Sequence, residues 1–113
     1  FGHTIGHALE TYFGFEKLRH GEAIAYGMIA AGNLSNEYQK LTTEHCELLK
    51  KIINKLPLPE LPEFDSSKVL KIIQKDKKIQ KGSINFILLE EIGRAVVKDN
   101  INEQSIINVL EDL

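Results

Sequence analysis

Residues 21–39 form the segment that most constrains what this chain can fold into. Its apolar residues, mainly Ala, Ile, Met and Leu, fall on most sides of a helix rather than on one stripe. A helix that is apolar all round is a buried one, so we expect the other elements to surround it. Gly27 and Gly32 lie inside this segment, and each costs a helix about 1 kcal/mol relative to Ala. We therefore predict close packing or a close approach of a ligand along this helix.

The rest of the sequence predicts four more helices and one short hairpin. Apolar residues recur at helical spacing in residues 1–13, 42–56, 65–73 and 102–113. Pro57, Pro59 and Pro62 mark an extended linker. Residues 84–89 and 95–97 are β-rich and are separated by Gly93. The predicted fold class is mainly α, a helical bundle with one small β-hairpin, in a single domain over residues 1–113.

Composition excludes several classes of protein. The chain has 113 residues, which suits one domain. Its 14 basic and 16 acidic residues give a net charge of −2, without the basic excess of a general nucleic-acid or membrane-surface binder. Cys46 is the one cysteine, and no apolar run approaches the roughly 20 residues that cross a bilayer. We therefore expect a cytoplasmic protein that binds neither nucleic acid nor membranes.

Three histidines form a candidate metal site. His3 and His7 are four residues apart, so they share one face of a helix. His20 and Glu22 precede or begin the central helix, and a helix–loop–helix turn can bring His20 beside His3. Imidazole is a common zinc ligand. The alternative is that these are ordinary surface or core histidines, and that Glu22 simply suits the positive end of a helix dipole.

A lysine-rich run is the second candidate site. Lys75, Lys77, Lys78 and Lys81 surround Asp76. One interpretation is a solvated turn. The other is a phosphate clamp, because flexible ammonium groups suit a phosphate that must be held and then released. Asp76 would then hold one of the lysines in place.

Three stretches of this sequence resemble the 3-dehydroquinate synthase family. FGHTIGHALE at residues 1–10 and LRHGEAIAYGM at residues 18–28 resemble its paired signature. DKKIQKGSINFILLEEIG at residues 76–93 resembles a later segment of that family, and the tail from Arg94 adds little. The resemblance implies that residues 1–113 are the C-terminal metal- and substrate-binding helical domain. A Rossmann-like N-terminal domain that binds NAD would lie outside this chain, whose first residues are not those of an ordinary start.

The resemblance also implies a reaction. Enzymes of this family convert DAHP, a phosphorylated seven-carbon keto-acid sugar, to 3-dehydroquinate with release of phosphate in the shikimate pathway of aromatic amino acid biosynthesis. They are carbon–oxygen lyases that depend on NAD and on zinc or cobalt. We expect the full-length protein to be a homodimer, and this domain to be inactive alone because the nucleotide site is missing.

Individual roles follow from the aligned positions. The resemblance makes His3 and His20 metal ligands, with a third ligand, a glutamate, in the N-terminal domain. It makes His7 an unligated residue that contacts substrate and moves protons. Lys77, or as second choice Lys78, would contact the substrate phosphate. Glu22 is expected to orient His20, since a ligating histidine usually needs a partner for its other ring nitrogen.

Two other functions remain open. Related sugar phosphate cyclases use the same fold, NAD and metal to make other carbocycles, and iron-dependent alcohol dehydrogenases share the architecture with less similar motifs. A stand-alone helical module without catalysis would use the histidines structurally or not at all.

Overall fold

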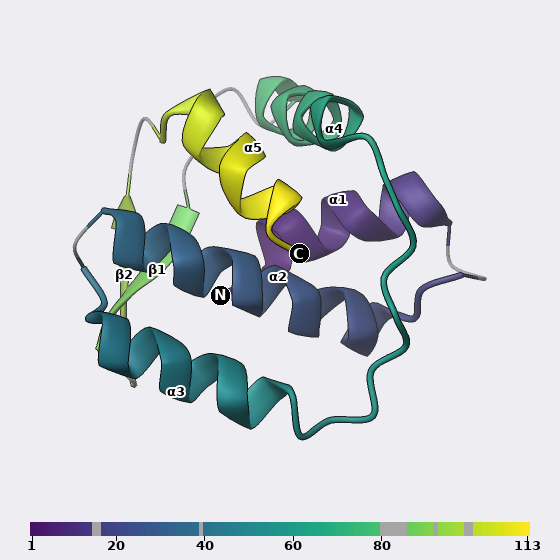
Figure 1. Ribbon diagram of the computed structural model, residues 1–113. Helices are drawn as coiled ribbons and strands as arrows, with labels where there is room; N and C mark the ends of the chain where they lie inside the picture. The colour runs from purple at the N-terminus through teal and green to yellow at the C-terminus, as the bar shows by residue number, and fades with distance from the viewer. Residues whose placement is uncertain (15–16, 39, 80–85, 92, 99–100) are drawn as a thin grey trace.

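The computed structural model describes residues 1–14, 17–38, 40–79, 86–91, 93–98 and 101–113, and for residues 77–79 it describes the backbone (Figure 1). Five helices and two strands make up this part of the chain. They are α1 (His3–Phe13), α2 (His20–Glu37), α3 (Thr43–Ile53), α4 (Ser66–Ile79), β1 (Phe86–Glu91), β2 (Arg94–Lys98) and α5 (Glu103–Glu111). The predicted helical bundle with one small hairpin is confirmed.

Helix α2 is the central element. It contacts α1, α3, α5 and β1, while α4 covers α1 and α5 (Figure 1). Large apolar side chains from several helices are almost fully buried around it, among them Leu9, Leu34, Ile73 and Ile106. The prediction of a buried central helix is therefore confirmed, with the bounds His20–Glu37.

The packing of α1 against α2 is unusually close at Gly27. A Cβ atom added to Gly27 would lie 2.1 Å from the Gly2 carbonyl oxygen and 2.7 Å from the Gly6 nitrogen. Gly2 itself has a φ of 84°, which favours glycine. The predicted close approach is thus made by the backbone of α1. At Gly32 a Cβ would meet the Leu49 side chain of α3 at 2.8 Å.

Local signals set the helix ends. The Thr42 hydroxyl accepts a hydrogen bond from the His45 N–H, and Asn102 Oδ1 accepts from the Gln104 N–H, as helix N-caps do. Helix α4 continues through the lysine run as far as Ile79. The interpretation of this run as a turn is therefore wrong for residues 75–79, because lysine favours helix and no glycine or proline interrupts it before residue 82.

The hairpin is fastened to the central helix. Strands β1 and β2 pair antiparallel, with Leu88 opposite Val96 and an irregularity between Leu89 and Glu91. The Leu89 N–H donates to the buried Ser35 hydroxyl of α2 at 3.0 Å. No helix in the described ranges is long and apolar enough to cross a membrane.

Candidate functional site

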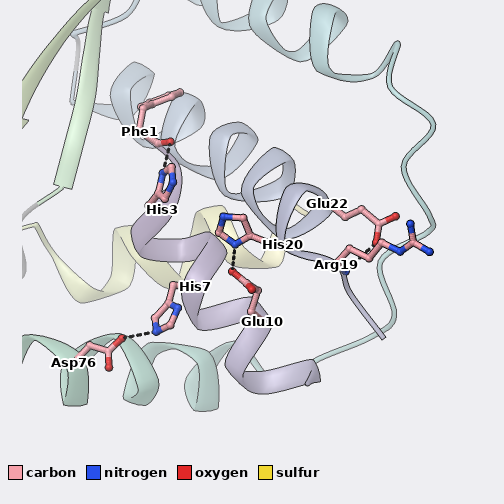
Figure 2. Close-up of polar contacts among 8 residues, drawn as sticks. All are labelled: Phe1, His3, His7, Glu10, Arg19, His20, Glu22 and Asp76. Atoms are coloured by element: carbon pink, nitrogen blue, oxygen red, sulfur yellow. Dashed lines mark hydrogen bonds and ion pairs between the residues drawn. The ribbon is translucent and has the colours of Figure 1, made fainter. Parts of the chain in front are cut away.

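His3 and His20 lie together where α1 and α2 begin. Their ring centroids are 6.1 Å apart and the ring planes are inclined by 63° (Figure 2). His3 is the first residue of α1 and His20 the first of α2. The helix–loop–helix path therefore brings the two imidazoles side by side, as their positions in the sequence predicted. Their role as metal ligands stays a prediction.

Among the residues that the structure describes, both histidines make their ring hydrogen bond through Nδ1. Nδ1 of His20 is 2.7 Å from Glu10 Oε1, and Nδ1 of His3 is 3.4 Å from the carbonyl oxygen of Phe1. A carbonyl oxygen and an ionised carboxylate can only accept, so we assign the proton of each ring to Nδ1. Nε2 of both rings then carries the lone pair that a metal ion needs.

Glu10 is the carboxylate that contacts His20, whereas Glu22 was expected in this role. The Glu22 carboxylate instead accepts a hydrogen bond from the Arg19 N–H at 2.9 Å. Glu22 is the third residue of α2, and an acidic side chain at that position returns to the backbone N–H of the residue that precedes the helix, here Arg19. We therefore correct the expected partner of His20 from Glu22 to Glu10.

A signal for Glu10 was present in the sequence. Glu10 follows His3 by seven residues, which is two turns of a helix, so the two side chains share a face. The Glu10 side chain is only 4% exposed, whereas that of His20 is 66% exposed. A glutamate so deeply buried, on the face that carries His3, is an unusual choice for packing alone.

The arrangement fits a divalent ion that prefers nitrogen ligands. Because zinc–nitrogen bonds are about 2.1 Å long, two imidazoles on one ion have ring centres on the order of 5 to 6 Å apart. The observed 6.1 Å is close to that range. Among the residues that the structure describes, no three His, Cys, Asp or Glu side chains gather to hold a metal ion. The described part of the chain thus offers two ligands, and further ligands would have to come from outside it.

His7 has a different neighbour from His3, although both lie on α1. Nε2 of His7 is 3.7 Å from Asp76 Oδ2 of α4, and the two side chains are 60% and 41% exposed. Figure 2 shows His7 directed toward α4, whereas His3 lies near His20. Asp76, which was expected to hold a lysine, is thus found beside a histidine.

The two lysines of the candidate phosphate site follow Asp76 directly. The backbone of Lys77 and Lys78 belongs to the last turn of α4. Their side chains, like the whole of Lys81, lie outside the described residues. Phosphate binding by Lys77 or Lys78 stays a prediction.

Among the described residues, Tyr26 and Cys46 have clearly shifted pKa values, and neither offers a reactive base. Burial raises the pKa of the Tyr26 hydroxyl, and the carboxylates of Glu22 and Glu60 raise it further. This hydroxyl donates to the Pro59 carbonyl oxygen and fastens the proline-rich linker to α2. Burial also raises the pKa of the Cys46 thiol in α3. Both groups are therefore protonated at neutral pH, and Cys46 is itself buried in the core.

Comparison with known proteins yields one family. Residues 1–79 match the model of the 3-dehydroquinate synthase C-terminal domain. The chain is 37% identical over its whole length to the 3-dehydroquinate synthase of Crocosphaera subtropica, and 41% identical to that of Methylacidiphilum infernorum. It spans 32% of the length of each of these relatives, so it corresponds to about a third of a synthase chain.

Solved structures agree with this match. A crystal structure of 2-deoxy-scyllo-inosose synthase with carbaglucose-6-phosphate, NAD+ and Co2+ superimposes with a TM-score of 0.84 at 26% identity, over 98% of this chain and 32% of that one. A 2-epi-5-epi-valiolone synthase from Streptomyces hygroscopicus shares the fold, with a TM-score of 0.87 at 23% identity over 99% of this chain and 31% of that one. The chain therefore belongs to the 3-dehydroquinate synthase family, in which it matches the C-terminal domain.

Proposed function

We propose that this chain is the metal- and substrate-binding domain of a 3-dehydroquinate synthase, and that the NAD-binding domain lies in the two thirds of the relatives that it does not cover. The full-length enzyme would convert DAHP to 3-dehydroquinate with release of phosphate in the shikimate pathway. The observation that carries this proposal is the adjacent His3–His20 pair, in which both rings make their hydrogen bonds through Nδ1, in a chain of this family. The domain alone would be inactive, because the nucleotide site is proposed to lie in the part of the relatives that this chain does not cover.

His3 and His20 would hold zinc or cobalt, together with a ligand from the other domain. When bound, the ion supplies Lewis acidity to the oxygens of the substrate. The neighbouring 2-deoxy-scyllo-inosose synthase was solved with Co2+, NAD+ and a sugar phosphate analogue. This supports a divalent metal, NAD and a phosphorylated keto-acid sugar as the cofactors and substrate of the present protein.

His7 would accept and return a proton at Nε2. Its side chain is 60% exposed, so it would be accessible to a substrate bound at this surface. A histidine suits this work because its ordinary pKa lies near neutrality. Lys77, or as second choice Lys78, would bind the phosphate, since α4 carries both residues to the side of the domain where Asp76 meets His7. We further expect a cytoplasmic homodimer, as the family resemblance implies.

A second candidate is another sugar phosphate cyclase, because solved members of that group match the fold closely. The two functions are separated by incubating the full-length protein with NAD+, Zn2+ and either DAHP or glucose 6-phosphate. We expect phosphate release and a 3-dehydroquinate product from DAHP alone. Turnover of glucose 6-phosphate would favour the second candidate. A full-length protein that turns over neither sugar would favour a non-catalytic module.

A further inference from the structure

The pair formed by Glu10 and His20 is the most buried polar contact at the candidate site. The carboxylate of Glu10 is 4% exposed, and its Oε1 lies 2.7 Å from His20 Nδ1. Removing a carboxylate from water costs several kcal/mol unless strong hydrogen bonds replace the lost hydration. The hydrogen bond to His20 offsets part of this cost. The burial of Glu10 and the position of the His20 ring therefore depend on each other.

The helices fix the direction of that ring. His3 and Glu10 stand two turns apart on the same face of α1, and His20 begins the neighbouring helix. Because Glu10 engages Nδ1, the opposite side of the imidazole, with Nε2, is left for the ion that His3 would share (Figure 2). The backbones of Gly27 and Gly2 are in contact, so α1 and α2 cannot move closer together. No side chain lies between them there that could change its rotamer to alter the helix spacing.

We propose that Glu10 is a positioning residue for His20: its carboxylate holds the proton on Nδ1 and keeps Nε2 available to the metal ion. The inference rests on the proposed metal-binding role of His3 and His20. A carboxylate behind a ligating imidazole fixes the tautomer and the ring orientation, and it makes the ligating nitrogen more basic. Glu10 does this without contacting the ion or the substrate.

Glu22 provides a matched control within the same chain. It is also a glutamate and stands two residues from His20, yet its carboxylate accepts from the Arg19 N–H at the start of α2. If any negative charge near His20 were sufficient, the two glutamates would be equivalent. If the specific hydrogen bond matters, only Glu10 should affect the ring.

The test uses the full-length synthase and compares Glu10→Ala, Glu10→Gln and Glu22→Gln. The dissociation constant for zinc is measured by competition with a chelator, and the tautomer of His20 is read from its ring ¹⁵N shifts in the metal-free protein. We expect Glu10→Ala to weaken zinc binding by roughly 10- to 100-fold, as is usual for such partners. Glu10→Gln should weaken it less, because an amide oxygen can still accept from Nδ1. Glu22→Gln should leave both readouts as in the wild type.

The outcomes separate this inference from the proposed function. If His3→Ala and His20→Ala lose zinc while both Glu10 variants bind it like the wild type with His20 still protonated at Nδ1, the role of Glu10 is wrong and the metal site stands. If His3→Ala and His20→Ala also bind zinc normally, the metal site itself is wrong. Should Glu10→Ala fail to fold, the nearly isosteric Glu10→Gln still decides through the same two measurements.

Discussion

Helix α1 takes part in two histidine–carboxylate pairs that differ in almost every physical respect. Glu10 and His20 join α1 to α2 at 2.7 Å, with the carboxylate buried. His7 and Asp76 join α1 to α4 at 3.7 Å, with both side chains substantially exposed. A hydrogen bond to a charged group typically contributes about 1.5 to 3 kcal/mol, whereas an exposed ion pair contributes about 0 to 1 kcal/mol.

The difference separates two kinds of task. A metal ligand must keep one orientation, and a short buried contact provides it. A residue that carries protons must approach and leave its partner, so a long and solvated contact is sufficient. The proposed function would use this difference, with metal binding on the α1–α2 side of the site and the substrate on the α1–α4 side.

The largest expected effect separates His3 from His7. In the full-length enzyme, His3→Ala should abolish stoichiometric zinc, while His7→Ala should keep zinc and lose turnover by roughly 10²- to 10⁴-fold, the usual size of general acid–base catalysis. The reason is that a metal-bound imidazole has its lone pair occupied and cannot accept a proton. Metal analysis beside steady-state rates measures both effects. If His7→Ala protein were purified without zinc, His7 would be a ligand. The distinction between the α1–α2 side and the α1–α4 side of the site would then be wrong.

The lysines test the substrate side. Lys77→Ala in the full-length enzyme should raise the Michaelis constant for DAHP by roughly 10- to 100-fold, since a charge-assisted bond to a desolvated phosphate is worth about 1.5 to 3 kcal/mol. Lys81→Ala should change it by less than about fivefold, as expected of a screened surface charge. If both variants changed the Michaelis constant by the same small factor, the lysine run would be a solvated helix end. The proposed phosphate contact on α4 would then be wrong.

Gly27→Ala tests whether the α1–α2 side is as rigid as its contacts indicate. The new methyl group would meet the Gly2 carbonyl oxygen, so the variant should lose about 1 to 3 kcal/mol of unfolding free energy and bind zinc more weakly. Gly21→Ala is the matched control, because its Cβ would meet no atom within 4 Å. Chemical denaturation and zinc competition measure the two effects. Unchanged zinc affinity in a destabilised Gly27→Ala protein would show that helix spacing does not set the ligand geometry.

The smallest expected effect is that of Asp76→Asn. An exposed pair at 3.7 Å should alter turnover by no more than about fivefold, and the difference from the wild type should shrink between about 0.05 and 0.5 M salt because of screening. Turnover rates at both salt concentrations provide the measurement. A loss as large as that of His7→Ala would mean that Asp76 holds His7 as firmly as Glu10 holds His20.

The sequence predicts the fold better than it predicts the partners within the site. Periodicity and caps such as Thr42 are local properties, so the elements and their ends could be predicted. The closeness of His3 and His20 also followed, because a single short loop connects their helices. The partner of His20 did not follow, because it depends on which face of α1 the second helix covers. The sequence therefore pointed to Glu22 rather than Glu10, although the spacing of Glu10 from His3 held the clue.

The contact between Gly27 and Gly2 has a mechanical consequence. No side chain separates the two backbones there. The contact between α1 and α2 therefore contains no group that could rotate or compress if one helix shifted against the other. An ion of another radius would have to be accommodated by rotation of the exposed His3 ring or by ligands outside this chain, while His20 keeps its place against Glu10. His20 would then be the ligand that stays fixed, and adjustment to different metals would come from the His3 ring and from ligands outside this chain.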